Sequence, residues 1–198
     1  GKIAGIYDKN FPTIAEMEAG IKASDNIAVV ECDFGKIGIA ICFDLNFEEL
    51  LKKYSSTDTD IIIYPSMSHG GVLQNIWALS CNSFFIGSIY RGFPSEIRNP
   101  LGDVIASTGN GTDHAFAKIN LDFKTVPVAY NYDNLAALKT KYGKTVKISD
   151  PGKNGTVIVT SYNKSISAEQ MTKEFSIELL NEYLDRARDI RLEEGNLE

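Results

Sequence analysis

Short apolar runs rich in β-branched residues alternate with stretches whose apolar positions recur at helical spacing. The runs predict strands at 3–7, 26–33, 36–42, 60–64, 84–90, 104–106 and 114–120. Helical or partly helical segments are predicted at 13–20, after Asn46 and at 71–82. Phe34-Gly35 separates the second and third runs, which favours a hairpin. Alternation of this kind is typical of an α/β protein.

The helix after Asn46 has the clearest boundary signals. Asn46 is a suitable N-cap residue. Glu48 and Glu49 follow in the first turn, and Lys52 and Lys53 lie in the last. This order of charges suits the helix dipole.

The pattern changes beyond Asp122. Residues 123–150 are polar and predict irregular structure, and the turn sequence 150–155 separates two β-rich pieces. We therefore expect two parts. Residues 1–122 would form the main domain, and residues 123–198 a C-terminal extension.

The extension ends in a predicted amphipathic helix. Ser167-Ala168-Glu169-Gln170 is a capping box, and the helical pattern continues to about Gly195. Its apolar stripe comprises Met171, Phe175, Leu179, Tyr183, Ala187 and Ile190. Such a stripe indicates packing, either on the domain or on a partner subunit.

Composition excludes several classes of function. A net charge of −6 and a pI near 5.0 leave no basic surface for nucleic acid. No apolar run approaches the roughly 20 residues that cross a bilayer, and no signal-peptide pattern opens the sequence. We expect a cytoplasmic protein that binds neither nucleic acid nor membrane.

The cysteines and histidines limit the redox and metal chemistry. Cys32, Cys42 and Cys81 are an odd number without C-x-x-C spacing, which fits a reducing compartment. His69 and His114 are the two histidines and lack neighbouring ligands, so we expect no zinc site.

Cys42 is the strongest candidate for chemistry. The strand 36–42 ends at this residue, and a sharp turn and a helix follow. The sulfur would lie near helix N-terminal amides, which favour the reactive thiolate, and the Phe43 N–H would face a developing oxyanion. The alternative is a small buried cysteine that only packs. Cys32 and Cys81 lack such a setting and are assigned to packing.

Lys9 is a second candidate, because it follows a predicted strand and precedes the loop Asn10-Phe11-Pro12. Its ammonium would stabilise an oxyanion if it projects into the same cleft. The alternative is an ordinary solvated lysine.

Four motifs carry a resemblance to a known family. They are Tyr-Asp-Lys-x-x-Pro-Thr from Tyr7, Ile-Cys-Phe-Asp-Leu-x-Phe from Ile41, Asp-Ile-Ile-Ile-Tyr-Pro-Ser from Asp60 and Asn-Pro-Leu-Gly-Asp-Val-Ile-Ala from Asn99. In order and spacing the chain resembles the nitrilase superfamily of carbon–nitrogen hydrolases, from about Ile3 to Asp122.

The resemblance implies a fold and a catalytic set. The fold would be an α-β-β-α sandwich, commonly dimerised through helices. Lys9 and Cys42 would match the lysine and cysteine of the family's Glu–Lys–Cys site. Glu18 fits best the further acid that follows the lysine, and Glu16 is its close rival.

The resemblance also predicts that the chain is incomplete. The family's general-base glutamate lies well upstream of the lysine, where this sequence has none. We therefore expect the C-terminal part of the domain, without its N-terminal strands and helices, and an inactive polypeptide when alone. The start at Gly1 without Met fits a cut chain.

The implied reaction is hydrolysis of an amide or N-carbamoyl carbon–nitrogen bond through a cysteine thioester, with no metal or organic cofactor. The main alternative is an inactive binding or assembly module, favoured by the missing glutamate. A thiol redox protein is disfavoured, because no resolving cysteine lies near Cys42 in the sequence.

The resemblance departs at Ala78-Leu79-Ser80-Cys81-Asn82, where the family usually carries an arginine and a glutamate. Tyr90 and Arg91 are the substrate-binding candidates, and Arg91 would suit a carboxylate. Trp77 and Phe93 are further pocket candidates for which packing is favoured. Expected partners are a small amide, identical subunits in a homodimer or higher homo-oligomer, and the missing N-terminal part.

Overall fold

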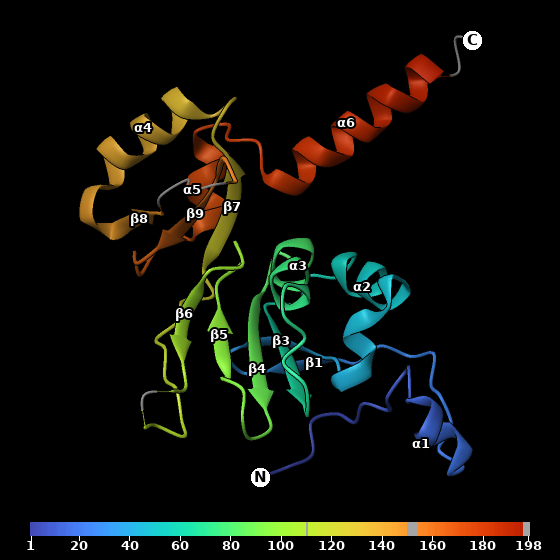
Figure 1. Ribbon diagram of the computed structural model, residues 1–198. Coiled ribbons are helices and arrows are strands. Elements are labelled where there is room, and N and C mark those ends of the chain that lie inside the picture. Colours follow the sequence, from blue (N-terminus) through green and yellow to red (C-terminus); the bar gives the residue numbers. More distant parts are fainter. Residues whose placement is uncertain (110, 150–153, 196–198) are drawn as a thin grey trace. The chain divides into compact units, whose positions relative to one another are not determined.

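The computed structural model describes residues 1–109, 111–149 and 154–195, and its chain divides into two compact units, Gly1–Ile119 and Asn120–Glu198. Each unit combines a β-sheet with helices (Figure 1). The expected α/β class is confirmed.

The first unit is built on a six-stranded sheet in the order β1-β2-β3-β4-β5-β6. Its strands are β1 (Val29–Cys32), β2 (Gly35–Ile39), β3 (Ile61–Ser66), β4 (Phe84–Ile89), β5 (Glu96–Arg98) and β6 (Val104–Ser107). β2, β3 and β4 are parallel, and the outer pairings are antiparallel. The parallel strands therefore end at one common edge of the sheet.

Short helices precede the first strand or connect the parallel strands. They are α1 (Ile14–Glu18), the 3₁₀ helix η1 (Cys42–Asn46), α2 (Glu48–Ser55) and α3 (Leu73–Ser80). α2 and α3 cover one face of the sheet (Figure 1). The core between them contains Ala40, Leu45, Leu50, Tyr54, Ile62, Tyr64, Trp77, Ala78, Cys81 and Phe85. This core fixes the loops at the carboxyl ends of the parallel strands.

The region before α2 differs from the prediction. Asn46 is not the N-cap residue, because it ends η1 and its side-chain amide donates to the Phe43 carbonyl at 3.0 Å. Phe47 takes the cap position without a side-chain bond. The predicted order of charges in α2 is confirmed, with acidic residues in the first turn and lysines in the last.

Two predicted strands are wrong. Residues 3–7 and 114–120 form no strand, and Ile3 and Phe116 are 85% and 83% exposed. Neither segment pairs with a strand among the described residues, so its apolar pattern has no sheet face to fill. The strand β5 was not predicted, because its three residues include a glutamate and an arginine.

The second unit contains a three-stranded sheet in the order β7-β9-β8, all antiparallel. Its elements are β7 (Phe123–Pro127), α4 (Tyr132–Tyr142), the 3₁₀ helix η2 (Gly143–Thr145), β8 (Val146–Ile148), β9 (Thr156–Ser161), α5 (Ala168–Glu174) and α6 (Leu180–Gly195). Its core contains Val126, Leu135, Leu138, Tyr142, Val146, Val157, Val159, Met171 and Ile177.

Two expectations for this unit are wrong. Residues 123–150 are not irregular, since β7, α4 and β8 lie within them and supply buried apolar side chains. The predicted final helix is interrupted. α5 ends at Glu174 and α6 begins at Leu180, and Ser176 between them has a φ of 49°. A left-handed residue cannot continue a right-handed helix.

The predicted turn at 150–155 lies mostly outside the described residues, but β8 and β9 flank it as expected. The Ser167–Gln170 capping box is confirmed. Among the described residues, no helix is long and apolar enough to span a bilayer.

Candidate functional site

Cys42 occupies a strained turn at the carboxyl edge of the parallel strands. β2 ends at Ile39, and the Ala40 N–H still bonds to the Ile63 carbonyl of β3 at 3.0 Å. Cys42 follows with a φ of 50° and begins η1. A left-handed conformation in a residue other than glycine costs about 1–3 kcal/mol and persists only where its surroundings fix it. The predicted strand–turn–helix setting is present, with a 3₁₀ helix in place of the α-helix.

The surroundings of the Cys42 sulfur favour its charged form. Burial raises the pKa of the thiol, but hydrogen bonding by the Ser66 hydroxyl and by the backbone of Met67 and Ser68 lowers it. The positive charge of Lys9 lowers it further, and the net pKa lies below that of an ordinary thiol. The segment that follows β3 therefore stabilises a Cys42 thiolate.

Lys9 is held by Glu16. The Lys9 ammonium, whose side chain is 14% exposed, donates to Glu16 Oε2 at 2.6 Å. The same oxygen accepts the Thr13 N–H at 2.6 Å, and the Thr13 hydroxyl accepts the Glu16 N–H, which completes the capping box of α1. The lysine bond and then the Thr13 backbone bond lower the pKa of Glu16.

The geometry favours Glu16 over Glu18 for the place beside the lysine. Glu18 ends α1 on an exposed position, and within the described part of the chain no hydrogen bond or ion pair involves its carboxylate. The two acids lie two residues apart on a helix, so they face different directions. Spacing alone did not separate them, whereas the Thr-x-x-Glu capping box that starts at Thr13 was the signal that could have done so.

Asp44 is a site residue that was not predicted from the sequence. Its side chain is fully buried and accepts three hydrogen bonds. They come from the Tyr7 hydroxyl at 2.8 Å, the Phe11 N–H at 2.7 Å and the Ile41 N–H at 2.8 Å. Asp44 therefore contacts both the segment that carries Lys9 and the turn that carries Cys42.

The other two cysteines lie in different surroundings. Cys81 is buried at the end of α3, and burial raises the pKa of its thiol to about 12. Cys32 is half-buried at the end of β1. Neither has the donors that surround Cys42.

A polar network stabilises the segment between β3 and α3. His69 Nε2 lies 3.2 Å from Glu96 Oε2, and Glu96 also pairs with Arg98. The Gly71 N–H donates to His69 Nδ1 at 3.2 Å, so Nε2 carries the hydrogen that faces Glu96. β5 supplies the acid and arginine, so the overlooked strand supports the segment beside Cys42.

The expected pocket residues have different positions. Trp77 is buried, and its indole N–H donates to the Leu45 carbonyl at 3.0 Å, so it packs in the core. Phe43 is partly exposed and contacts Phe47 edge-on. Tyr90 is exposed, and its N–H donates to the Ser66 carbonyl at 2.8 Å. The end of β4 thus adjoins the segment that contacts Cys42.

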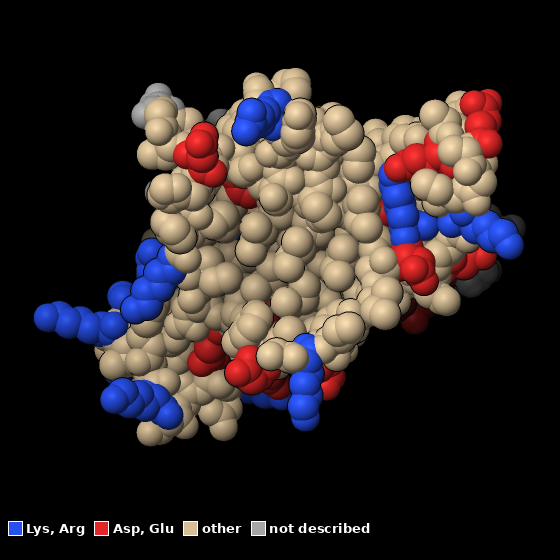
Figure 2. All heavy atoms as spheres, turned by 90° about the horizontal axis from the view of Figure 1, so that it is seen from below, with Lys and Arg blue, Asp and Glu red and all other residues tan. Residues whose placement is uncertain are grey.

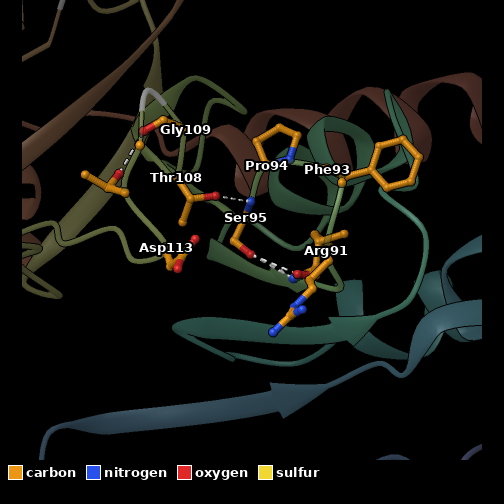
Figure 3. Close-up of a pocket in the computed structure, with 11 residues that line it drawn as sticks. Arg91, Phe93, Pro94, Ser95, Thr108, Gly109 and Asp113 are labelled. Carbon is orange, nitrogen blue, oxygen red and sulfur yellow. Dashed lines mark hydrogen bonds between the residues drawn. The ribbon is translucent and has the colours of Figure 1, made fainter.

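Arg91 and Phe93 line an open pocket of about 800 Å³ that begins at the end of β4. Its other described lining residues are Ile89, Gly92, Pro94, Ser95, Thr108, Gly109, Gly111, Thr112 and Asp113. Figure 3 shows Ser95 between the Arg91 end and the Thr108–Asp113 end. The Ile89 N–H donates to the Ser95 hydroxyl at 2.8 Å and the Ser95 N–H to the Thr108 hydroxyl at 2.8 Å, which ties the two walls together.

Charged residues are unevenly distributed over the face toward which β3 and β4 run. Figure 2 shows that face from below, with Lys, Arg, Asp and Glu side chains mainly around its margin and few at its centre. Within the described ranges, no three His, Cys, Asp or Glu side chains form a metal-binding group.

Comparison with known sequences extends these observations. The profile of the carbon–nitrogen hydrolase family matches residues 1–123. The rat deaminated glutathione amidase is 31% identical over 110 residues, which is 48% of this chain and 34% of the relative. A probable hydrolase nit2 of Schizosaccharomyces pombe is 31% identical over 134 residues, 57% of this chain and 49% of the relative. The omega-amidase NIT2 of Xenopus tropicalis is 28% identical over 120 residues, 52% of this chain and 43% of the relative.

These matches show that the chain spans between about a third and a half of the length of these curated relatives. Solved structures show the same fold. A carbon–nitrogen hydrolase from Helicobacter pylori superimposes with a TM-score of 0.55 at 19% identity, covering 61% of this chain and 53% of the other. An amidase from Nesterenkonia gives a TM-score of 0.51 at 14% identity, covering 69% and 57%.

The profile match covers more than half of the chain and includes Lys9, Glu16 and Cys42. The shared fold of the solved structures agrees with it. The chain belongs to the carbon–nitrogen hydrolase family of the nitrilase superfamily.

Proposed function

We propose that this chain carries part of the active site of an amidase or N-carbamoyl amidohydrolase in which Cys42 is the nucleophile. The observation that carries the proposal is the strained turn at Cys42, beside the charged pair Lys9–Glu16, in a member of a hydrolase family. Backbone strain at a residue that borders a cleft is often associated with catalytic function.

In the first half-reaction the Cys42 thiolate attacks the carbonyl carbon of the amide. The C=O electron pair moves onto oxygen, and the oxyanion is stabilised by the Lys9 ammonium and the Phe43 N–H. Phe43 lies in the first turn of η1, where backbone N–H groups lack an acceptor within the helix. The carbon–nitrogen bond then breaks, and the amine or ammonia leaves with the proton that the general base took from the Cys42 thiol.

In the second half-reaction water attacks the thioester, loses a proton and releases the carboxylic acid and the thiolate. Glu16 holds the Lys9 ammonium in place through both steps by the 2.6 Å contact. No proton transfer is assigned to Glu16, because its carboxylate already accepts from Lys9 and Thr13.

For the substrate we propose a small amide that carries an anionic group. Arg91 provides a forked cationic donor at the pocket that adjoins the Ser66 segment. The names of two relatives, deaminated glutathione amidase and omega-amidase, denote amide hydrolysis by those proteins and support the same class here.

The general base is the part of the reaction that the resemblance assigns to a glutamate ahead of the lysine. No glutamate precedes Lys9 in the sequence. We propose that residues 1–198 alone therefore turn over amides far more slowly than a longer polypeptide that supplies such a glutamate. An assay of small-amide hydrolysis, in which released ammonia is measured, tests this for residues 1–198 and for the longer polypeptide. The Cys42→Ala variant is the control. Turnover by residues 1–198 that disappears in Cys42→Ala would place the base within this sequence.

The alternative function, an inactive binding or assembly module, makes a different prediction in that assay. It requires that the longer polypeptide also release no ammonia and that Cys42→Ala leave ligand binding unchanged. The retained thiolate surroundings of Cys42 favour the enzyme, because a binding module needs no lowered thiol pKa.

Cytoplasmic location and homo-oligomerisation are further parts of the proposal. Residues 123–198 would act as an extension that packs on the domain or on a partner subunit. Leu184, Ile190 and Leu192 of α6 are exposed, which supports a role for this helix in subunit contacts. Light scattering of the wild type and of Ile190→Asp tests it, with a monomeric wild type as the contrary result.

A further inference from the structure

Asp44 is a fully buried carboxylate for which the proposed mechanism has no step. A buried charge is stable only when hydrogen bonds replace its lost hydration. Asp44 accepts from three donors, and these donors belong to two separate segments of the chain. The arrangement of these donors indicates what the charge does.

Two of the donors flank Lys9 in the sequence. The Tyr7 hydroxyl donates to Oδ2 and the Phe11 N–H to Oδ1, so the carboxylate contacts the chain on both sides of the lysine. The ring of Phe11 also stacks on Phe47, with 3.8 Å between ring centroids. The Lys9 segment is thus attached to the region that follows Cys42.

The third donor belongs to the Cys42 turn itself. The Ile41 N–H donates to Asp44 Oδ2, and the Asp44 N–H donates to the Ile41 carbonyl at 3.1 Å. These two bonds close the turn around Cys42 and oppose relaxation of its left-handed backbone. One side chain therefore holds both the nucleophile's turn and the lysine's segment.

We propose that Asp44 is a positioning residue whose buried carboxylate locks the Lys9 segment onto the Cys42 turn, so that ammonium and sulfur act on the same carbonyl group. The inference rests on the proposed function, because the relative position of Lys9 and Cys42 matters only if both groups act on the substrate. A displacement of about 1 Å in such a pair is enough to lower catalysis strongly.

The sign of one measurement separates this role from a simple charge effect. Asp44→Asn removes a negative charge near the sulfur, and that alone would lower the pKa of Cys42. Loss of positioning removes the influence of the Lys9 ammonium and relaxes the turn, and both raise the pKa. We expect a rise of at least about half a unit. The rate of iodoacetamide labelling at Cys42 against pH, read by peptide mass mapping, measures it.

The double variant with Lys9→Met tests whether Asp44 acts through the lysine. Lys9→Met alone is expected to raise the pKa of Cys42. In that background Asp44→Asn should cause a clearly smaller rise than in the wild type, or a fall. Equal shifts in the two backgrounds would contradict the inference, as would an unchanged or lowered pKa in Asp44→Asn itself.

Two further variants control for stability. Ser83 is also fully buried, and its hydroxyl lies within hydrogen-bonding distance of two acceptors, the Thr59 carbonyl at 2.6 Å and the Cys81 carbonyl at 2.8 Å. Ser83→Ala should lower the melting temperature and leave the pKa of Cys42 unchanged. If Asp44→Asn does not fold, Tyr7→Phe removes one of the three bonds without changing charge and should still raise the pKa.

The outcomes also separate this inference from the proposed function. A wild-type Cys42 with the pKa of an ordinary thiol would contradict the proposed site itself. A low wild-type pKa that neither Asp44→Asn nor Tyr7→Phe raises would leave the site intact and overturn only the role of Asp44.

Discussion

Lys9 Nζ donates to Glu16 Oε2 at 2.6 Å, and the same oxygen accepts the Thr13 N–H that begins α1. The lysine proposed to face the substrate is therefore attached to a helix cap. The lysine bond and the Thr13 bond depress the pKa of Glu16. Because the pKa of Glu16 is lowered in the folded protein, the contact stabilises the fold at pH values above the ordinary glutamate pKa. This stabilisation is lost as the pH falls through the lowered pKa.

Glu16→Gln is expected to lower the pKa of Cys42 further. The amide oxygen still accepts from Lys9, but the negative charge that offsets the ammonium is gone, so the thiolate is favoured. The shift should be about a few tenths of a unit in the pH profile of Cys42 alkylation. Glu18→Gln makes the same change of charge on an exposed position and should have no effect. Equal shifts in the two variants would remove Glu16 from the site.

Ser66→Ala is expected to raise the pKa of Cys42. The hydroxyl of Ser66 is the largest of the influences that lower this pKa. Its oxygen accepts the Ser68 N–H at 3.1 Å and lies 2.7 Å from the Ser68 carbonyl oxygen. We predict a rise of about half a unit. Ser68→Ala keeps the backbone donors and should leave the profile in place. If the pKa of Cys42 rises in Ser68→Ala and not in Ser66→Ala, the hydroxyl that stabilises the thiolate belongs to Ser68.

Much of the fold around the site was predictable from local signals. The hairpin β1–β2, the strands β3 and β4 and the helix α3 follow from apolar runs and turn residues that agree with their buried positions. The Thr13 and Ser167 capping boxes are equally local. The position of Cys42 between a strand and a helix was predictable from the same local pattern.

The remaining features depend on contacts between distant residues. β5 is a strand because Arg98 and Glu96 are paired and buried against neighbours that the sequence cannot identify. Residues 3–7 have a strand pattern and no partner strand in the described chain. The buried carboxylate of Asp44 is stabilised by hydrogen bonds from Tyr7 and Phe11, which lie more than 30 residues away in the sequence. These features cannot be predicted from local sequence, because contacts between residues far apart in the chain determine them.

Arg91→Met is expected to distinguish acyl donors by charge. Loss of a charge-assisted bond to a carboxylate should slow acylation of Cys42 by mono-p-nitrophenyl succinate about tenfold. Acylation by neutral p-nitrophenyl acetate should be unchanged and serves as the control within the same variant. Release of p-nitrophenolate measures both rates, and an equal loss for both donors would exclude Arg91 as an anion-binding residue.

Leu50→Ala tests the core that supports the site. Leu50 is completely buried in the cluster that also contains Trp77, the single tryptophan. The free energy of unfolding should fall by about 2–5 kcal/mol. Urea unfolding followed by Trp77 fluorescence reports on this unit. Ile3→Ala, on an exposed and irregular segment, should change it by less than about 0.5 kcal/mol. A larger loss for Ile3→Ala than for Leu50→Ala would contradict the packing described here.

We propose that Cys42 forms the thioester of an acyl-transfer reaction. Treatment of the folded protein with p-nitrophenyl acetate, followed by rapid acid quench and peptide mass mapping, tests this step. We expect an acetyl group on Cys42 that hydroxylamine removes, with none on Cys32 or Cys81 and none in the Cys42→Ala variant. Acetylation that spares Cys42 while the protein is folded, or that is found first on Cys32, would show that Cys42 is not the nucleophile.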